Sequence, residues 1–238
     1  MTSPNPTLGA LTAAITADTV GGSGGVLTWN YSVAAAAVEF LAQDEVRTEV
    51  FDVSFSDGKG GTLIKTVSVT LTGTNDVPVI TAEDLSGAVL ESVSTEGNLT
   101  DSGIINFSDV DLTDSHSVTE VTSPNPTLGT LTAAITADTV GGSGGVLTWN
   151  YSVAAAAVEF LAQDEVRTEV FDVSFSDGKG GTLIKTVNVT LTGTNDVPTF
   201  YLDSTGNADS ASTTLVETNS GLTANGTLTL TDADTTDT

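Results

Sequence analysis

The sequence predicts an all-β chain made of tandem Greek-key β-sandwich domains with about seven short strands each. Three observations predict this class: a long internal repeat, a period-two alternation of apolar and polar residues, and glycine-rich turns between the alternating segments. Apolar residues make up 39% of the 238 residues, which is enough to fill sandwich cores. The chain is therefore expected to be globular rather than a disordered tail.

The repeat sets the domain boundaries. Residues 2–78 recur 120 positions later as residues 122–198, and residues 225–237 resemble residues 101–114. A unit of about 120 residues can bury its own core, unlike a solenoid repeat. The chain should thus contain the C-terminal part of one repeat (1–78), a complete repeat (79–198) and the N-terminal part of the next (199–238). The two long copies differ only at Ala10/Thr130 and Ser68/Asn188.

The strands follow from the alternation. In FDVSFSDG, the apolar Phe171, Val173 and Phe175 alternate with polar residues, and TLIKTVNVTLTG continues the pattern after DGKGG, which predicts a hairpin. VLTWNYSV, GIINFS and LGTLTAAI are further predicted strands because of their β-branched and aromatic residues. The segment AAAAVEFLAQ favours a helical turn or two across one end of the sandwich. GGSGG is interpreted as a hairpin turn, because it lacks the residues of a phosphate loop or a calcium nonapeptide.

The charge excludes several partners. Six Lys and Arg against 31 Asp and Glu give a formal charge of −25, which repels nucleic acids and anionic membranes and attracts cations. No apolar run is long enough to span a bilayer, so no membrane insertion is expected, and the first residues lack a signal-peptide pattern. Without cysteine, a metal must be held by oxygen ligands, which favours a hard ion such as Ca²⁺.

Catalysis is not expected. His116 is the only histidine, and its polar surroundings in DLTDSHSV favour a surface position. Carboxylates are numerous, yet their recurrence at strand ends in each repeat fits a structural site better than a glycosidase pair. The chain is therefore predicted not to be an enzyme.

The acidic residues gather in predicted loops. SDVD places Asp109 and Asp111 along one irregular loop, and TNDVP places Asp76 at a unit boundary, with further acids in AQDE and SDGKGG. A solvated surface is the plain interpretation of such residues. Mixed carboxylate, amide and carbonyl oxygens are, however, the ligands of Ca²⁺, which takes six to eight of them. Calcium is the favoured interpretation.

These motifs resemble the cadherin-like, Ig-like and VCBS-type repeats of giant type I secreted (RTX) bacterial adhesins, over nearly the whole chain. The matching elements are the boundary TNDVP, a glutamate in the first strand region, Asp-x-Asp, an acidic pair, and SDGKGG before a strand and GTND. The resemblance implies that each boundary is a calcium cluster shared by neighbouring domains. It groups Asp44, Glu45, Asn75 and Asp76 with Asp109, Asp111 and Asp177 at the first boundary, and Glu91, Asp164, Glu165, Asn195 and Asp196 with Asp232 and Asp234 at the second.

The resemblance also implies a role. A calcium-stiffened row of repeats on the bacterial cell surface would act as an extender that holds a distal binding domain away from the cell for attachment or biofilm formation. The alternative is an Ig-like module that itself binds carbohydrate or protein. That alternative needs exposed aromatic residues, and only Trp29 with Tyr31, repeated as Trp149 with Tyr151, could serve. Their spacing of two places each pair on one strand face, where core packing is the favoured interpretation.

The incomplete units predict self-association. Residues 199–238 correspond to the front of a repeat and residues 1–78 to the back of one, and each alone would leave strands unpaired. The tail of one molecule is therefore expected to complement the head of another, as a swapped dimer or as an open head-to-tail fibre. The other expected partners are neighbouring repeats of the same protein.

Overall fold

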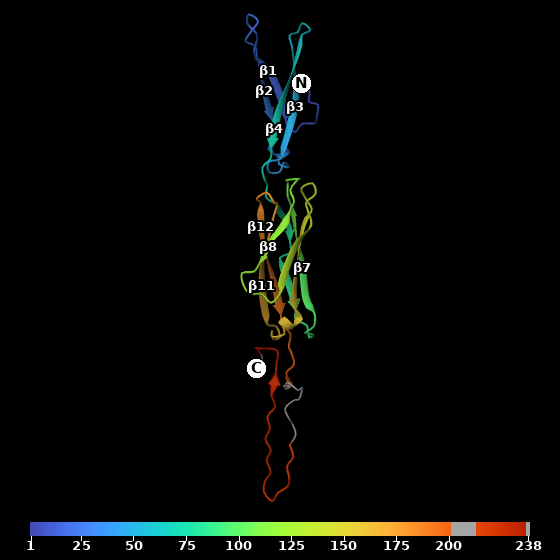
Figure 1. Cartoon of the computed structure of the whole chain (residues 1–238), viewed down its shortest axis with the longest axis vertical. Helices are drawn as coiled ribbons and strands as arrows, with labels where there is room; N and C mark the ends of the chain where they lie inside the picture. Colours follow the sequence, from blue (N-terminus) through green and yellow to red (C-terminus); the bar gives the residue numbers. More distant parts are fainter. Residues whose placement is uncertain (201–212, 237–238) are drawn as a thin grey trace.

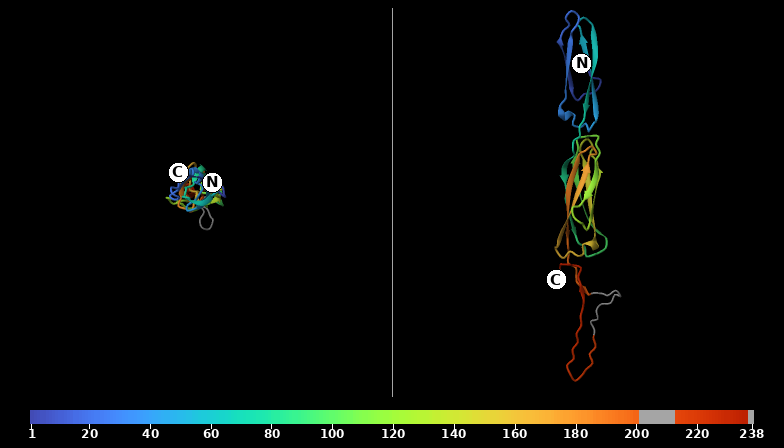
Figure 2. Two further views of the ribbon diagram at one scale, coloured as in Figure 1. Left: turned by 90° about the horizontal axis from the view of Figure 1, so that it is seen from above. Right: turned by 60° about the vertical axis from the view of Figure 1, so that its left-hand side comes forward.

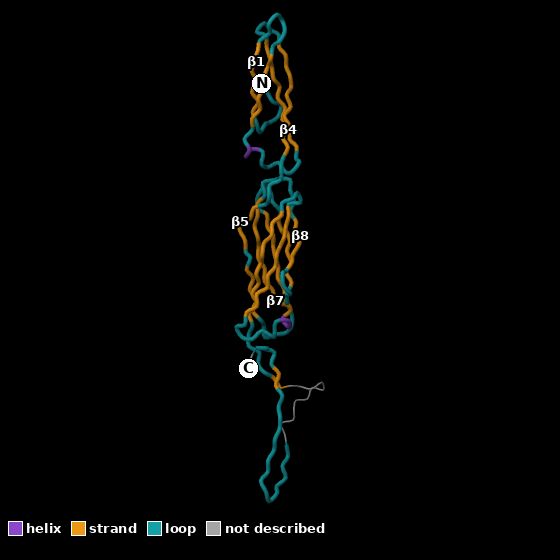
Figure 3. The backbone as a smooth tube through the Cα atoms, turned by 90° about the vertical axis from the view of Figure 1, so that its left-hand side faces the viewer, coloured by secondary structure: helices purple, strands orange, loops and turns teal. Residues whose placement is uncertain are grey.

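The computed structural model describes residues 1–200 and 213–236. Three parts follow one another along a single axis: the head domain (residues 1–78), the central domain (79–198) and the described residues of the tail segment (199–238) (Figure 1). Viewed along that axis the molecule is narrow (Figure 2). The strands of the head and central domains run lengthwise, so their loops lie at the domain ends, including the ends that meet at the two junctions (Figure 3). Throughout the described residues, no helix is long and apolar enough to cross a membrane.

The central domain is a sandwich of two four-stranded sheets, ordered β5-β7-β10-β9 and β6-β12-β11-β8. All neighbouring strands are antiparallel except β6 and β12, which are parallel. The fold class is as predicted, with eight strands in place of about seven. They are β5 (Val79–Glu83), β6 (Ser86–Leu90), β7 (Asn98–Ser108), β8 (Ser117–Thr122), β9 (Thr130–Ala137), β10 (Gly145–Ala154), β11 (Val166–Ser176) and β12 (Thr182–Thr192).

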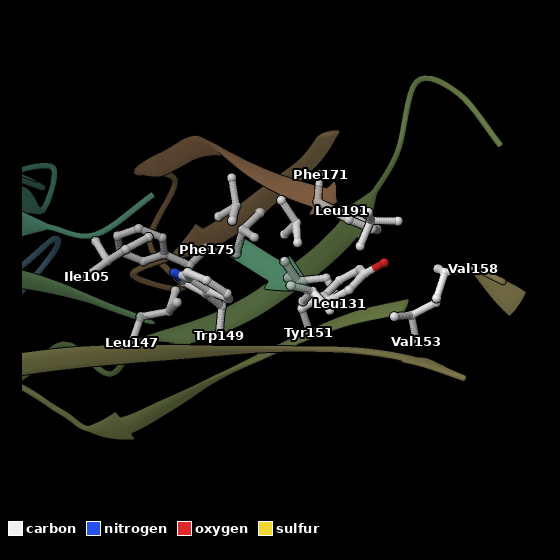
Figure 4. Packing of buried hydrophobic residues seen from close by; sticks show 14 of the residues in the cluster. Ile105, Leu131, Leu147, Trp149, Tyr151, Val153, Val158, Phe171, Phe175 and Leu191 are labelled. Atoms are coloured by element: carbon white, nitrogen blue, oxygen red, sulfur yellow. The ribbon is translucent and has the colours of Figure 1, made fainter. Parts of the chain in front are cut away.

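The core lies between these sheets and follows the predicted alternation. Trp149 and Tyr151 point inward from β10 with 0% and 1% of their surface exposed, and Phe175 faces them from β11 (Figure 4). Each such buried side chain contributes about 1.5–3 kcal/mol of hydrophobic stabilisation. The core interpretation of the Trp149 and Tyr151 pair is therefore confirmed in the central domain, where neither is exposed to a ligand.

Turns and connections agree with their sequences. β11 and β12 form the predicted hairpin through SDGKGG. GGSGG turns the chain between β9 and β10, with Gly141, Gly142 and Gly144 at positive φ. AAAAVEFLAQ contains only a three-residue 3₁₀ turn in each copy, η1 (Ala35–Ala37) and η2 (Ala155–Ala157).

The head domain repeats only the second half of this sandwich. Its four strands form two separate antiparallel hairpins, because it contains no counterparts of β5 to β8. The tail segment pairs its two short strands with each other. The bounds are β1 (Ala10–Ala17), β2 (Val26–Ser32), β3 (Val46–Ser56) and β4 (Thr62–Thr72) in the head, and β13 (Thr199–Phe200) and β14 (Leu230–Thr231) in the tail.

A buried carboxylate fastens the entry loop of β9 to the core. Glu169 is 3% exposed and accepts hydrogen bonds from the backbone N–H groups of Leu128 and Gly129 and from the Tyr151 hydroxyl, which lies 2.7 Å away. Any other residue at position 129 would clash with Tyr151, because a Cβ there would lie 2.2 Å from the Tyr151 hydroxyl oxygen. Burial, followed by the bond to Glu169, raises the pKa of Tyr151, so the hydroxyl stays a donor.

Replacing this carboxylate should strongly destabilise the central domain. Glu169→Ala leaves three buried donors without an acceptor and is expected to cost about 3–5 kcal/mol of unfolding free energy. Glu169→Gln, which keeps an acceptor, should cost less. Urea unfolding followed by near-ultraviolet circular dichroism measures both. Equal losses for the two variants would contradict the hydrogen-bond explanation.

Candidate metal centres at the two junctions

At the first junction, the C-terminal end of the head domain meets the loop between β7 and β8 of the central domain. Asp109 and Asp114 come from that loop, and Asp177 comes from the β11–β12 hairpin. One carboxylate oxygen from each lies within 4.8 Å of the others, and all three residues are buried. Three carboxylates this close repel one another strongly unless a cation lies between them.

Local hydrogen bonds orient these side chains. The Asp111 N–H donates to Asp109 Oδ1 over 3.0 Å, so the Asp-x-Asp sequence closes an Asx turn. Asp177 Oδ1 accepts the N–H groups of Lys179 and Gly181 at 2.7 and 3.0 Å. A Cβ at Gly181 would lie 2.0 Å from Asp177 Oδ2, so the glycine makes room for this carboxylate.

The head domain contributes the boundary residues Asn75 and Asp76. Asn75 Nδ2 donates to Asp177 Oδ2 over 3.0 Å, and the Asp76 N–H donates to Asp111 Oδ2 over 2.7 Å. Two further bonds cross the junction, from Thr113 Oγ1 to Glu45 Oε2 at 3.1 Å and from the Leu112 N–H to the Phe40 carbonyl at 3.3 Å. The boundary peptide and the acidic loop therefore belong to one site.

Between the central domain and the tail segment, the second junction repeats the Asp-x-Asp turn and three of the four bonds across the first; among the described residues the Asn75–Asp177 bond has no counterpart. The Asp-x-Asp turn recurs, with the Asp234 N–H donating to Asp232 Oδ1 at 3.1 Å. The boundary bond recurs from the Asp196 N–H to Asp234 Oδ2 at 2.9 Å. The remaining two bonds also recur, from Thr236 Oγ1 to Glu165 Oε2 at 3.0 Å and from the Thr235 N–H to the Phe160 carbonyl at 3.2 Å.

A second acidic group lies on the central-domain side of this junction. Glu91 follows β6, Glu159 follows η2, and Asp196 belongs to the boundary peptide; one carboxylate oxygen of each lies within 4.8 Å of the others. Glu91 is only 6% exposed, and its Oε2 accepts the Thr194 N–H at 2.7 Å. Oxygen ligands from three segments therefore converge here.

Buried oxygens without hydrogen-bond partners gather at these two places. Within the described residues, all eight buried side-chain oxygens that lack a protein partner lie at the junctions, four at each. Leaving such a group unpaired costs about 1–3 kcal/mol, and more when it is charged. A cation at each junction would give buried oxygens there a partner, and the all-oxygen donor set fits Ca²⁺. These atoms are Asn75 Oδ1, Asp111 Oδ1 and both Asp114 oxygens, and Glu91 Oε1, Glu159 Oε1, Asp196 Oδ2 and Asp234 Oδ1.

The electrostatics agree with this interpretation. The pKa of Asp111 is raised to about 6, first by burial and then by the charges of Asp109 and Asp114, against the opposing effect of the bond from the Asp76 N–H. Burial, followed by the charges of neighbouring acids, also raises the pKa of four other carboxyls. These are Asp114, Glu91, Glu159 and Asp196.

The raised pKa of Asp111 predicts opposite pH effects without and with calcium. A pKa raised in the folded state stabilises the fold when the group is protonated, and this contribution is lost as pH rises through about 6. Calcium-free protein should therefore lose unfolding free energy between about pH 4 and 7. Calcium competes with the proton, so calcium affinity should rise over the same window. Thermal melts and calorimetric titrations at both ends of the window measure these trends; parallel trends would contradict the assignment.

His116 corrects the expectation of a surface histidine. Its side chain is fully buried, with Nε2 3.0 Å from Asp109 Oδ2 and Nδ1 2.6 Å from Asp138 Oδ1. Its ring packs on Phe107 with centroids 4.8 Å apart. The expectation was wrong because Phe107, from β7, and Asp138, which follows β9, meet the ring only in the folded sandwich. His116 therefore positions Asp109.

In each predicted acidic pair, Asp44–Glu45 and Asp164–Glu165, the glutamate takes part in a junction and the aspartate does not. Glu45 and Glu165 accept bonds across their junctions. Asp44 and Asp164 are exposed and belong to neither carboxylate group. Each has a positive φ, and the N–H of each donates a hydrogen bond to the carbonyl of a glycine in the facing loop. Asn195 Nδ2 donates to the carbonyl of Asp196 at 2.9 Å.

Two residues in the carboxylate groups were not among the sequence candidates. Asp114 extends Asp-x-Asp to Asp-x-Asp-x-x-Asp, a spacing that recurs in TDADTTD and could have revealed it. Glu159 lies in the segment interpreted as a connection, and only the folded sandwich brings it beside Glu91.

No protein-family model matches the chain, and no curated protein matches it. Among solved structures it is similar to the mouse clustered PcdhgC3 EC1-3 structure, with 12% identity over 80% of this chain and 57% of that one, at a TM-score of 0.39. It is also similar to domains 4 and 5 of the S-layer protein SbsC, with 13% identity over 77% and 98% of the two chains, at a TM-score of 0.27. Such scores assign no family, so function is inferred below from the junctions.

Proposed function

We propose that the chain is a non-catalytic spacer of a bacterial surface protein, in which calcium ions brace successive β-sandwich repeats into a stiff rod. The supporting observation is that the Asp-x-Asp turn and the bond from the boundary aspartate N–H recur at both junctions, each of which also has four buried oxygens that lack a partner. Bonds that recur between successive parts of the chain act on the connection between domains. We therefore infer that the junctions determine how rigid and how extended the molecule is.

The ligand chemistry favours calcium over other ions. At the first junction, four carboxylates and one amide surround the same space, and no thiolate or free imidazole is among them. Hard oxygen donors suit Ca²⁺ and Mg²⁺, but Mg²⁺ keeps several of its waters. Each junction instead offers four buried protein oxygens that lack a partner, which could take the place of such waters around Ca²⁺. Extracellular modules of this kind bind calcium at about 0.1–1 mM.

A bound ion would brace the two domains because the bonds at the first junction run between them. Asn75 and Asp76 belong to the head domain, while Asp111 and Asp177 belong to the central domain, so an ion among them holds both domains. Without the ion, the like charges repel across a single linking strand of chain and the junction becomes a hinge. The protein would therefore be flexible at low cytosolic calcium and rigid outside the cell.

The proposal is tested by counting bound ions and locating them. Equilibrium dialysis of the chain against ⁴⁵Ca²⁺ should show saturable binding at sub-millimolar calcium. Asp234→Asn, with Asp196 and Asp232 unchanged, should weaken binding at the second junction only. Terbium luminescence excited through Trp29 or Trp149 provides a second readout. Absence of saturable binding would overturn the calcium function.

A further inference from the structure

The central domain carries an acceptor motif for asparagine-linked sugars. Asn98, Leu99 and Thr100 form Asn-x-Thr, the pattern at which an asparagine side chain receives a glycan. Glu96 stands two positions earlier, so the segment reads Glu-Gly-Asn-Leu-Thr. A carboxylate at that distance gives a transferase a charged group that an arginine beside its acceptor groove can bind. This five-residue motif is the one that bacterial oligosaccharyltransferases select.

The acidic residue sets Asn98 apart from the other asparagines of the sequence. Five further asparagines are followed by a residue other than proline and then by Ser or Thr, and each has Thr or Ile two positions before it. These are Asn30, Asn106, Asn150, Asn188 and Asn225. Asn5 and Asn125 are followed by proline, which excludes modification. Asn98 alone has the complete five-residue motif.

β7 begins at Asn98 and presents the motif at the surface. Strand alternation places Asn98 and Thr100 on the outer side, where both are exposed. Leu99 lies on the inner side and packs against the core. Glu96, just before the strand, is exposed as well. The three side chains that a transferase reads therefore all face solvent.

The backbone around the motif is open on its N-terminal side. Residues 92–97 belong to no strand, and Val93 is 90% exposed. Within the described chain, β5 pairs with residues 105–108 of β7, so Asn98 has a single strand neighbour, Ala154 of β10. An acceptor segment must enter the groove of the transferase. Exposed chain at the beginning of a strand can do so with little loss of structure.

Asn150 shows the contrast. It is exposed too, but it lies in the middle of β10, which is paired with β7 on one side and with β9 on the other. Its neighbours in sequence, Trp149 and Tyr151, are buried in the core. The backbone at Asn150 therefore cannot leave the sheet without opening the sandwich.

We propose that Asn98 is an N-glycosylation site that receives an oligosaccharide from a lipid-pyrophosphate donor. The side-chain amide nitrogen of Asn98 attacks the anomeric carbon of the first sugar and forms a C–N bond. The bond from that carbon to the pyrophosphate oxygen breaks, the nitrogen loses one proton, and the lipid pyrophosphate leaves. The transfer needs no oxidant or reductant. This modification goes beyond the spacer function and does not depend on calcium.

A glycan on Asn98 would stand at the end of the central domain that carries the second carboxylate group. The Ala155 N–H of η2 donates to the Gly97 carbonyl over 3.0 Å, and Glu159 of that group follows η2. The sugars would shield the exposed loop of residues 92–97, which is the kind of segment that proteases cleave.

The site is tested by incubating the folded full chain with a purified bacterial oligosaccharyltransferase and lipid-linked oligosaccharide, followed by intact-mass and peptide mass spectrometry. The wild-type chain should gain one oligosaccharide, on Asn98. Asn98→Gln should gain none. Glu96→Gln should be modified at least about tenfold more slowly, because one charge-assisted hydrogen bond to the enzyme is lost. Asn150→Gln is the matched control and should be modified like wild type.

Thr148→Glu separates the motif from its exposure. This variant gives Asn150 the same acidic residue two positions earlier, inside the sheet, and the folded protein should still be modified on Asn98 alone. Modification of Asn150 in this variant would contradict the argument from exposure. An unmodified wild-type chain, or equal rates for wild type and Glu96→Gln, would overturn the proposed site. Thermal melts of each variant check that the fold is intact.

Discussion

Saturating calcium is expected to raise the thermal midpoint of the chain by at least about 10 °C over the chelated protein. An ion bound at about 0.1 mM and supplied at 10 mM adds about 2.7 kcal/mol of stability, and about 1 kcal/mol shifts the midpoint of a domain of this size by several degrees. The central domain carries ligands at both of its ends, so two junctions act on it. Differential scanning calorimetry in calcium and in chelator measures the shift.

Magnesium is the control for this experiment. At the same concentration it screens the surface charge of −25 equally well, yet it should give a much smaller shift because it gives up its waters reluctantly. Equal shifts with both ions would indicate screening of the acidic surface, and the junctions would then need no bound ion.

Asp111→Asn is expected to have opposite effects in the two conditions. Asp111 is fully buried, and its Oδ1 has no partner. Its pKa of about 6 against an ordinary value of 3.8 indicates a carboxylate whose charged form costs about 2–3 kcal/mol in the calcium-free fold. Asparagine keeps the acceptor for the Asp76 N–H and removes that charge. The variant should therefore be more stable than wild type in chelator and less stable in calcium.

Asp44→Asn is the matched control for this prediction. It removes the same charge from the same junction region, and asparagine tolerates the positive φ of 61° at this exposed position. Its stability should follow wild type in both conditions. Urea unfolding in calcium and in chelator provides the four comparisons. Destabilisation of Asp111→Asn in both conditions would contradict a metal site and indicate an ordinary structural carboxylate.

The sequence predicted the sandwich and part of the junctions for physical reasons. Alternation in FDVSFSDG and VLTWNYSV reflects the side on which each residue of a strand lies, and it placed Trp149 and Phe175 in the core. In SDVD and SDGKGG, N–H groups two to four residues away orient the aspartate oxygens, so a few adjacent residues determine the geometry of these turns. These features were predictable because they are local.

The parts that were not predicted depend on distant contacts. His116 is buried because Asp138, from the end of another strand, closes over it. Glu159 joins Glu91 only after β6 and η2 have met at one end of the sandwich. Trp29 and Trp149 show the same effect directly: identical local sequences differ from 46% to 0% in exposure, because only one of them has the strands that cover it.

Small-angle X-ray scattering of the dilute chain in calcium and in chelator tests the central claim most directly. Braced junctions predict a single stiff rod in calcium, with the head, the central domain and the tail in line as in Figure 1. In chelator, the account predicts a broad distribution of shorter particles, because repulsion among the junction carboxylates opens two hinges. Identical scattering in the two conditions would contradict calcium bracing.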